Sequence, residues 1–275
     1  MQLITTLDDE RVASYRNLRE RRLRDEGIFI TEGALLAQRL LQSHFEIESL
    51  FVTEENATSF AEQLQNRAPL PPLYVAKASL LRQIVGFDFH RGVLAIGKRL
   101  PFPDVISAIS KTACSASSFA FIACPHTETS ENLGLIVRSA LAFGIRGLLL
   151  SNDGADPLSR RCLRQSMGSA LTLPIARSAD LLQDLVALRQ SVGLQLVAAV
   201  AQSDGKPIAL PQFTWPQRSV LILGNEYQGL EKAWLDKCDF QVTIPLAPDH
   251  DSLNVAVATG VLLYHMSSQL TNNRL

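Results

Sequence analysis

Three segments combine short apolar runs with small polar residues, as ligand-binding turns of α/β proteins do. Residues 221–230 read LILGNEYQGL, residues 252–258 read SLNVAVA after the apolar residues 244–246, and residues 132–138 read NLGLIVR. A strand that ends in such a turn exposes backbone N–H and C=O groups, which can hold a small molecule. The segments therefore predict a small-ligand site with an arginine near it.

The glycine spacing of the chain excludes two common kinds of nucleotide-binding site, and the first concerns the turn at 224–229. Its two glycines have the spacing of a phosphate-binding loop, but Leu230 stands where that loop requires lysine. No G-x-G-x-x-G follows a predicted strand, so the usual dinucleotide-binding oxidoreductase is excluded as well. Glu226 remains as a candidate functional carboxylate, and a plain turn with a solvated acid is the alternative.

Arg138 and Asn254 are the polar side chains that stand out in two apolar helical patterns. Arg138 lies off the apolar stripe of a helix predicted to open at Asn132, so it can reach the carboxyl edge of a sheet or be an ordinary surface residue. Ser252 is the predicted N-cap of the last helix. Asn254 then falls just inside that helix, where it is either a local cap or a functional residue.

Composition describes an ordinary globular chain. Its 275 residues carry a net charge of −1 and are 47% hydrophobic, which suits one large or two modest domains with a full core. The four cysteines form no C-x-x-C pair, so we expect neither a zinc site nor a redox pair, and no metal. Because no apolar run approaches the roughly 20 residues that span a bilayer, we expect a cytoplasmic protein without membrane contact.

A cluster of arginines near the N-terminus departs from this balanced charge. It is opposed within its own stretch by Glu20, and it can be a solvated helix face or a contact for phosphate. The cluster consists of Arg11, Arg16, Arg19, Arg21, Arg22 and Arg24.

Two α/β regions are predicted. In residues 1–98, Asp8 and Asp9 cap a helix to Arg24, followed by strands at 28–30, 47–53, 73–76 and 92–97 and helices at 34–42, 58–65 and 79–84. Residues 99–117 read as a linker with a short helix at 104–110. In residues 118–275, strands at 119–124, 147–151, 194–200, 220–223 and 240–244 alternate with helices at 132–143, 159–167, 179–191, 231–237 and 253–270, which predicts a parallel sheet covered on both faces.

Taken together, the three segments resemble the sequence motifs of the SpoU/TrmH branch of the SPOUT RNA methyltransferases. Residues 164–168 (RQSMG) also resemble a stretch that lies between the first two motifs, and residues 21–33 resemble the start of an L30e-like substrate-binding domain. The resemblance implies an α/β chain with an N-terminal L30e-like domain and a C-terminal parallel-sheet SPOUT domain that contains a trefoil knot. It also implies a homodimer.

The resemblance further implies transfer of a methyl group from S-adenosylmethionine to a ribose 2′-hydroxyl of RNA. The residues implied for donor binding are Leu223, Gly224, Ile244 and Leu253. Those implied for catalysis are Asn132, Arg138, Glu226, Ser252 and Asn254. Those expected to contact RNA are Arg16, Arg19, Arg21, Arg22, Arg24 and Arg164.

Arg138 is expected to act as a cation in this reaction, because a guanidinium hardly deprotonates in proteins. Residues 129–133 lack the proline that relatives usually carry shortly before or after the first-motif asparagine, so the entry to the site is expected to differ. The two-domain layout favours ribosomal RNA. The alternatives are a transfer RNA 2′-O-methyltransferase and a non-catalytic RNA-binding protein with a degenerate knot.

Overall fold

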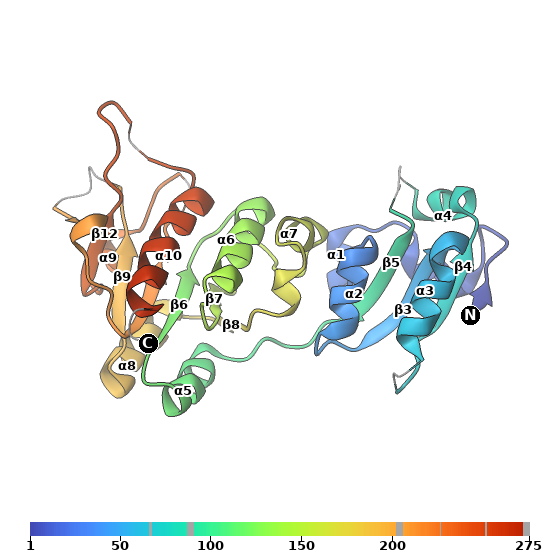
Figure 1. Cartoon of the computed structure of the whole chain (residues 1–275), viewed down its shortest axis with the longest axis horizontal. Coiled ribbons are helices and arrows are strands. Elements are labelled where there is room, and N and C mark those ends of the chain that lie inside the picture. The colour runs from blue at the N-terminus through green and yellow to red at the C-terminus, as the bar shows by residue number, and fades with distance from the viewer. Residues whose placement is uncertain (66–67, 87–90, 202–205, 226, 251, 272–275) are drawn as a thin grey trace. The chain divides into compact units, whose positions relative to one another are not determined.

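The computed structural model describes residues 1–65, 68–86, 91–201, 206–225, 227–250 and 252–271 of the chain. These residues form two compact units, shown in Figure 1. Unit 1 consists of Met1–Pro101 and Leu158–Thr172, and unit 2 of Phe102–Pro157 and Leu173–Leu275. None of the helices in the described part is long and apolar enough to cross a membrane.

Unit 1 is built on a mixed sheet in the order β1-β4-β3-β5-β2. Strand β5 runs antiparallel to both of its neighbours, while β1, β4 and β3 are parallel. The strands are β1 (Gln2–Leu3), β2 (Ile28–Glu32), β3 (Ile47–Thr53), β4 (Leu73–Ala76) and β5 (Val93–Lys98), and the helices between them are α2 (Ala34–Gln42), α3 (Glu54–Leu64) and α4 (Ala78–Val85). Helix α7 (Arg160–Gln165) and the 3-10 helix η2 (Ser169–Leu171) also belong to this unit.

The N-terminal helix predicted from Asp8 to Arg24 is wrong, because the chain forms two short helices there. These are the 3-10 helix η1 (Glu10–Tyr15) and α1 (Glu20–Asp25). Asp9 does act as a cap, since its side chain accepts a hydrogen bond from the Arg11 backbone N–H. The break lies at Asn17, whose φ of 48° is left-handed and cannot continue a right-handed helix.

Unit 2 contains an all-parallel sheet in the order β10-β12-β9-β11-β6-β7-β8. The strands are β6 (Phe119–Cys124), β7 (Leu148–Ser151), β8 (Ile175–Ser178), β9 (Gln195–Ala199), β10 (Ile208–Ala209), β11 (Arg218–Ile222) and β12 (Phe240–Thr243). The helices are α5 (Val105–Ser115), α6 (Ser130–Ala142), α8 (Leu181–Val192), α9 (Lys232–Leu235) and α10 (Val255–Thr271), with a 3-10 turn η3 (Leu210–Gln212). The predicted parallel sheet is therefore confirmed.

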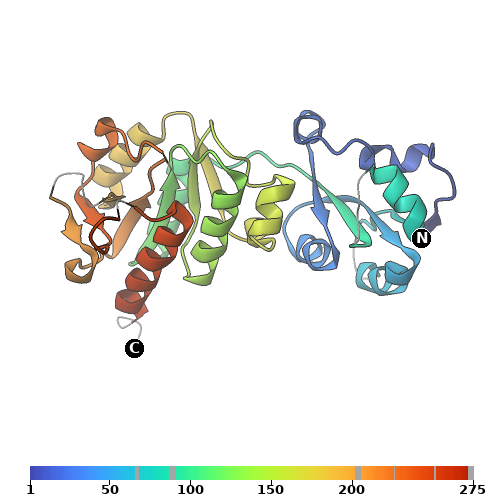
Figure 2. The same cartoon turned by 90° about the horizontal axis from the view of Figure 1, so that it is seen from above.

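The sheet of unit 2 is buried on both faces. Phe119, Phe121 and Ala123 of β6 join one core cluster with α5 and α8, while the alternating Ala120 and Ile122 are buried on the other side. Helices α6 and α10 lie side by side there (Figures 1 and 2). This two-sided burial explains why the strands of unit 2 read as continuous apolar runs.

Helix α5 is longer than the short helix predicted within residues 99–117. The Asp104 carboxylate accepts a hydrogen bond from the Ser107 backbone N–H at 2.8 Å and so caps the first turn. That bond lowers the pKa of the Asp104 carboxyl. Val105 and Ile109 are fully buried against α8, so this segment is a packed part of unit 2.

Candidate active site

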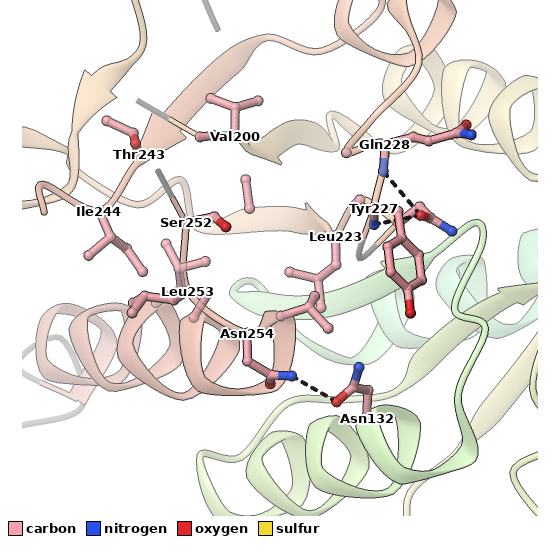
Figure 3. Close-up of a pocket in the computed structure, with 18 of the residues that line it drawn as sticks. Asn132, Val200, Leu223, Tyr227, Gln228, Thr243, Ile244, Ser252, Leu253 and Asn254 are labelled. Atoms are coloured by element: carbon pink, nitrogen blue, oxygen red, sulfur yellow. Dashed lines mark hydrogen bonds between the residues drawn. The ribbon is translucent and has the colours of Figure 1, made fainter. Parts of the chain in front are cut away.

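A cavity of about 600 Å³ opens in unit 2 where the strands β9, β11 and β12 end, as Figure 3 shows. The first turn of α6 and the start of α10 complete its wall. The carboxyl ends of parallel strands are where open α/β sheets bind ligands. The described lining residues are Thr129, Asn132, Ala199, Val200, Ala201, Leu223, Gly224, Asn225, Tyr227, Gln228, Gly229, Val242, Thr243, Ile244, Leu246, Ser252, Leu253, Asn254, Val255, Ala258 and Leu262.

The two glycines of the 224–229 turn have different tasks. A side chain at Gly224 would place its Cβ 2.6 Å from the carbonyl carbon of Gly229, so the backbone can close here only without one. Gly229 has a φ of +68°, which favours glycine. Asn225 and Gly229 exchange two backbone hydrogen bonds, at 2.9 and 3.0 Å. The G-x-x-x-x-G spacing therefore encodes a tight backbone turn that walls the cavity.

The side chain of Asn225 fixes this turn from inside. Its Oδ1 accepts hydrogen bonds from the backbone N–H groups of Tyr227, at 2.8 Å, and Gln228, at 3.2 Å. Its Nδ2 donates to Glu128 Oε1 at 2.8 Å, which ties the turn to the loop between β6 and α6. Asn225 was not among the residues predicted from the sequence. Its place directly after Gly224, just beyond the end of β11, was the available signal.

Asn132 and Asn254 come together although 122 positions separate them. The Asn254 Nδ2 donates to Asn132 Oδ1 at 3.1 Å. The Asn254 Oδ1 also accepts from the backbone N–H groups of Ala256 and Val257, so Asn254 caps α10. The prediction that Ser252 is the cap is therefore wrong. The interpretation of Asn254 as a local cap is confirmed, and its functional role stays a prediction.

Helix α6 begins without the proline that the resemblance led us to look for. Thr129 is its N-cap, and its hydroxyl accepts a hydrogen bond from the Asn132 backbone N–H at 3.3 Å. A threonine cap leaves the first helical position at Ser130, where a proline would also be tolerated. The missing proline therefore does not displace Asn132 from the cavity wall.

The predicted site residues fall into three groups. The cavity brings together Asn132, Leu223, Gly224, Ile244, Ser252, Leu253 and Asn254. Arg138 is exposed on α6, is not among the lining residues, and makes no hydrogen bond or ion pair with the residues that the structure describes. Glu226 lies outside the described residues. Sequence reasoning missed Ala199–Ala201, although the predicted end of a strand at Val200 could have indicated them.

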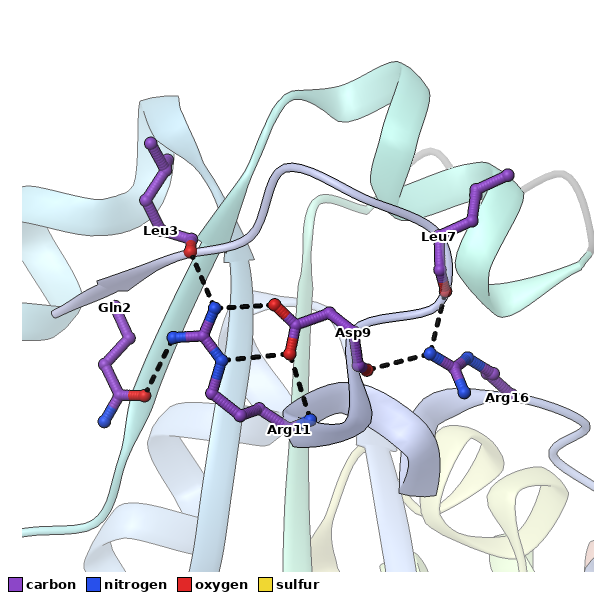
Figure 4. A network of polar contacts seen from close by, with 6 residues as sticks. All are labelled: Gln2, Leu3, Leu7, Asp9, Arg11 and Arg16. Atoms are coloured by element: carbon purple, nitrogen blue, oxygen red, sulfur yellow. Dashed lines mark hydrogen bonds and ion pairs between the residues drawn. The ribbon is translucent and has the colours of Figure 1, made fainter.

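The arginine cluster of unit 1 is divided between structural and exposed side chains. Arg16 donates to the backbone carbonyls of Leu7 and Asp9, as Figure 4 shows, and Arg22 pairs with Glu26 at 2.7 Å. The hydrogen bond from Arg11 lowers the pKa of the Asp9 carboxyl. The exposed members are Arg11, which pairs with Asp9, and Arg19, Arg21 and Arg24.

Arg164 is also half-exposed. Its Nη1 lies 3.9 Å from Glu32 Oε2, and Glu32 is the closer partner of Arg160, at 2.5 Å. Arg164 is therefore held only by a long contact, and 47% of its side chain is exposed. Among the described residues, no group of three or more His, Cys, Asp and Glu side chains could hold a metal ion.

Fold and cavity define a two-unit α/β protein with a small-ligand site at the carboxyl ends of a parallel sheet. Residues 120–264 match the model of the SpoU rRNA methylase family, and residues 9–94 match an MRM3-like substrate binding domain. The chain therefore belongs to the SpoU rRNA methylase family and is an RNA methyltransferase.

Curated relatives match all or part of the chain. An uncharacterized tRNA/rRNA methyltransferase of Mycobacterium bovis is 34% identical over 265 residues, which is 94% of this chain and 88% of the relative. A 23S rRNA uridine 2′-O-methyltransferase of Streptomyces viridochromogenes is 35% identical over 52% of this chain and 50% of its own.

A solved structure agrees with this assignment. The SpoU methyltransferase AviRb of Streptomyces viridochromogenes, in complex with the cofactor AdoMet (S-adenosylmethionine), is 26% identical and has a TM-score of 0.77 over 94% of this chain and 96% of its own. The predicted family, fold class and enzyme class are confirmed, and the AdoMet-bound relative supports the predicted methyl donor.

Proposed function

We propose that this protein methylates a ribose 2′-hydroxyl of ribosomal RNA, with S-adenosylmethionine bound in the cavity of unit 2. The observation that carries the proposal is the hydrogen bond between Asn254 and Asn132, both of which line the cavity at the carboxyl ends of β9, β11 and β12. The 2′-hydroxyl as acceptor is supported by the 2′-O-methyltransferase of Streptomyces viridochromogenes to which the chain is similar. The proposed place of the protein is the cytoplasm.

The cavity suits a ligand with an apolar body and a polar edge. Leu246, Leu253 and Leu262 supply apolar walls, while the 224–229 turn and the ends of β9 and β12 supply backbone groups. The close approach at Gly224 keeps this wall free of a side chain. Ligand pockets are commonly built in this way, with few polar groups that fix orientation. S-adenosylmethionine, once bound, supplies an activated methyl group on a sulfonium.

The chain must then place the acceptor ribose and manage its proton. Arg138 can hold a phosphate of the RNA and stabilise the developing alkoxide as a cation. In the pocket, the amides of Asn132 and Asn254 can orient the ribose. Glu226 is proposed to fix Arg138 or the RNA, and Ser252 to shape the pocket floor. The exposed Arg19, Arg21, Arg24 and Arg164 are proposed to hold the RNA backbone, with Arg16 and Arg22 adding charge beside them.

A homodimer belongs to this proposal, because Arg138 is exposed and a single copy does not place it in the cavity wall. Beside it, Val257, Val261 and Tyr264 leave an apolar stripe exposed on α10 at the i, i+4, i+7 spacing of one helix face. A second copy seated on α6 and α10 would cover this stripe and surround Arg138. The trefoil knot is likewise proposed, and the adjacency of β12 to β9 and β10 is compatible with it.

The choice of ribosomal over transfer RNA rests on the substrate-binding domain matched at residues 9–94 and on the Streptomyces relative, which is a 23S rRNA methyltransferase. The transfer RNA alternative is tested by the same experiment. Purified protein is incubated with methyl-labelled S-adenosylmethionine and either ribosomal or transfer RNA from a strain that lacks the gene, and 2′-O-methylated nucleotides are mapped by their resistance to alkaline cleavage.

We expect label in ribosomal RNA alone, at a position that loses its methyl group in the deletion strain. Label in transfer RNA alone, or on a base, would overturn the proposal. Arg138→Ala serves as the companion variant. It should abolish methylation while S-adenosylmethionine still binds, and loss of donor binding would contradict the role given to Arg138.

A further inference from the structure

Tyr227 lies at the rim of the cavity with its side chain largely exposed. It is a lining residue of the cavity, yet 81% of its surface is exposed. Figure 3 shows its ring hanging from the 224–229 turn on the side of Asn132. The ring takes part in none of the aromatic contacts found among the described residues. It therefore presents a free aromatic face at the rim of the cavity, on the side of Asn132.

The backbone that carries Tyr227 is held in place before any ligand arrives. The Tyr227 N–H donates to Asn225 Oδ1 at 2.8 Å, and Asn225 is bonded in turn to Glu128 and to the backbone of Gly229. A side chain presented from a fixed turn loses little freedom on binding, because only its two side-chain torsions remain to be ordered. Such a position is suited to recognition rather than to core packing.

An RNA acceptor can use a surface of this kind. Sequence-specific RNA recognition mostly targets single-stranded loops and bulges, whose unpaired bases stack on aromatic side chains. We propose that Tyr227 is a substrate-positioning residue that stacks on an unpaired base beside the methylated ribose. This inference rests on the proposed function and adds a residue to its acceptor side.

The competing assignment is that Tyr227 closes over the methyl donor. The exposure of the ring argues against it, because a residue that covers the donor would be expected to pack against Leu246, Leu253 or Leu262 inside the cavity. Donor affinity therefore separates the two roles. A stacking residue changes the affinity for RNA and leaves that for the donor unchanged.

The experiment compares four variants of the full chain, Tyr227→Ala, Tyr227→Leu, Tyr227→Phe and Tyr227→Trp. The readouts are the Kd for a fluorescently labelled single-stranded RNA of mixed sequence, the Kd for S-adenosylmethionine, and the KM for RNA. The alanine variant should weaken RNA binding and raise KM by about 5- to 150-fold, the range expected for one lost stacking contact. Its donor Kd should change less than about twofold, and its Tm should stay that of the wild type.

The leucine variant is the matched control, because it keeps apolar area without an aromatic face. We expect it to behave like alanine, and phenylalanine and tryptophan to behave like the wild type. Leucine equal to phenylalanine, or a weakened donor Kd in the alanine variant, would overturn the proposal. A wild-type protein that binds single-stranded RNA through Tyr227 but methylates none would refute the proposed function and leave this contact standing.

Discussion

The side-chain amide of Asn254 bonds Asn132 at 3.1 Å and, through its oxygen, caps the helix that follows it. One residue thus links the end of the 244–254 segment to the first turn of α6 and also starts α10. This arrangement couples the position of Asn132 to a helix cap. The cap and the pocket contact use different atoms of the same amide, so substitutions can separate them.

Asn254→Ala should lower the free energy of unfolding by about 1 kcal/mol, because it removes an N-cap acceptor. Asn254→Asp keeps that acceptor and adds a charge that the helix N-terminus favours, so its stability should match the wild type. It loses the amide donor to Asn132, and its methylation rate should fall at least about tenfold, the effect of roughly 1.4 kcal/mol on a barrier. Urea titration and initial rates measure the two effects. An aspartate variant with full activity would show that the amide link has no catalytic role.

Gly224→Ala should abolish S-adenosylmethionine binding, because the added Cβ would lie 2.6 Å from Gly229 and the turn could not close. Gly193→Ala is the matched control. Gly193 ends α8 with a φ of +67° and has open space around its Cα, so alanine should cost about 1 kcal/mol of stability and leave donor binding intact. Isothermal titration calorimetry distinguishes the two variants. Equal donor affinity in both would contradict the role given to the turn.

Helices and strands could be predicted from the sequence where the local pattern of apolar residues agrees with the packing in the fold. The bounds of α2, β3 and β6 match the prediction, because apolar runs and flanking turn residues define them locally. Strand β8 was not predicted, because Arg177 interrupts its short apolar stretch. The Arg177 guanidinium donates hydrogen bonds to the backbone carbonyls of Ser151 and Asn152. The helix break at Asn17 could not be predicted either, because asparagine is only moderately unfavourable in helices.

The candidate site shows the same limit. Asn132 and Asn254 could be selected one at a time, but their hydrogen bond is a product of the fold and not of any sequence spacing. Asn225 was overlooked because its side chain serves backbone groups two and three residues onward and Glu128 on another loop. Residues that shape a site through backbone contacts carry little chemical signal of their own.

A second copy of the chain should cover the exposed stripe on α10. Val257 is 54% and Tyr264 69% exposed, and Tyr264 packs edge-on against Phe143 with ring centroids 6.4 Å apart. Paired Val257→Asp and Val261→Asp substitutions should convert a dimer into a 30.2 kDa monomer and abolish methylation. Ile106→Asp, at a position of α5 that is 44% exposed, is the control and should stay dimeric. Light scattering after gel filtration gives the masses, and a wild-type monomer would refute the dimer.

Thiol chemistry should separate the cysteines by burial. Burial raises the pKa of the Cys238 thiol to about 12, with the Asp239 carboxylate adding to the shift, so Cys238 stays protonated and unreactive near neutral pH. Cys124 and Cys162 are buried, whereas Cys114 is exposed. At pH 8, an alkylating reagent should label Cys114 rapidly in the folded protein and all four thiols in denaturant, as peptide mass spectrometry can show.

The raised pKa of Cys238 also makes the free energy of unfolding depend on pH. The folded pKa of Cys238 lies above its ordinary value of 9.0, so its contribution is complete below about pH 9 and is lost as the pH rises towards 12. Cys238→Ala should remove this alkaline loss, while Cys114→Ala should leave it unchanged. Unfolding midpoints measured between pH 8 and pH 11 provide the comparison, and rapid native labelling of Cys238 at pH 8 would show that its surroundings are more open than this packing allows.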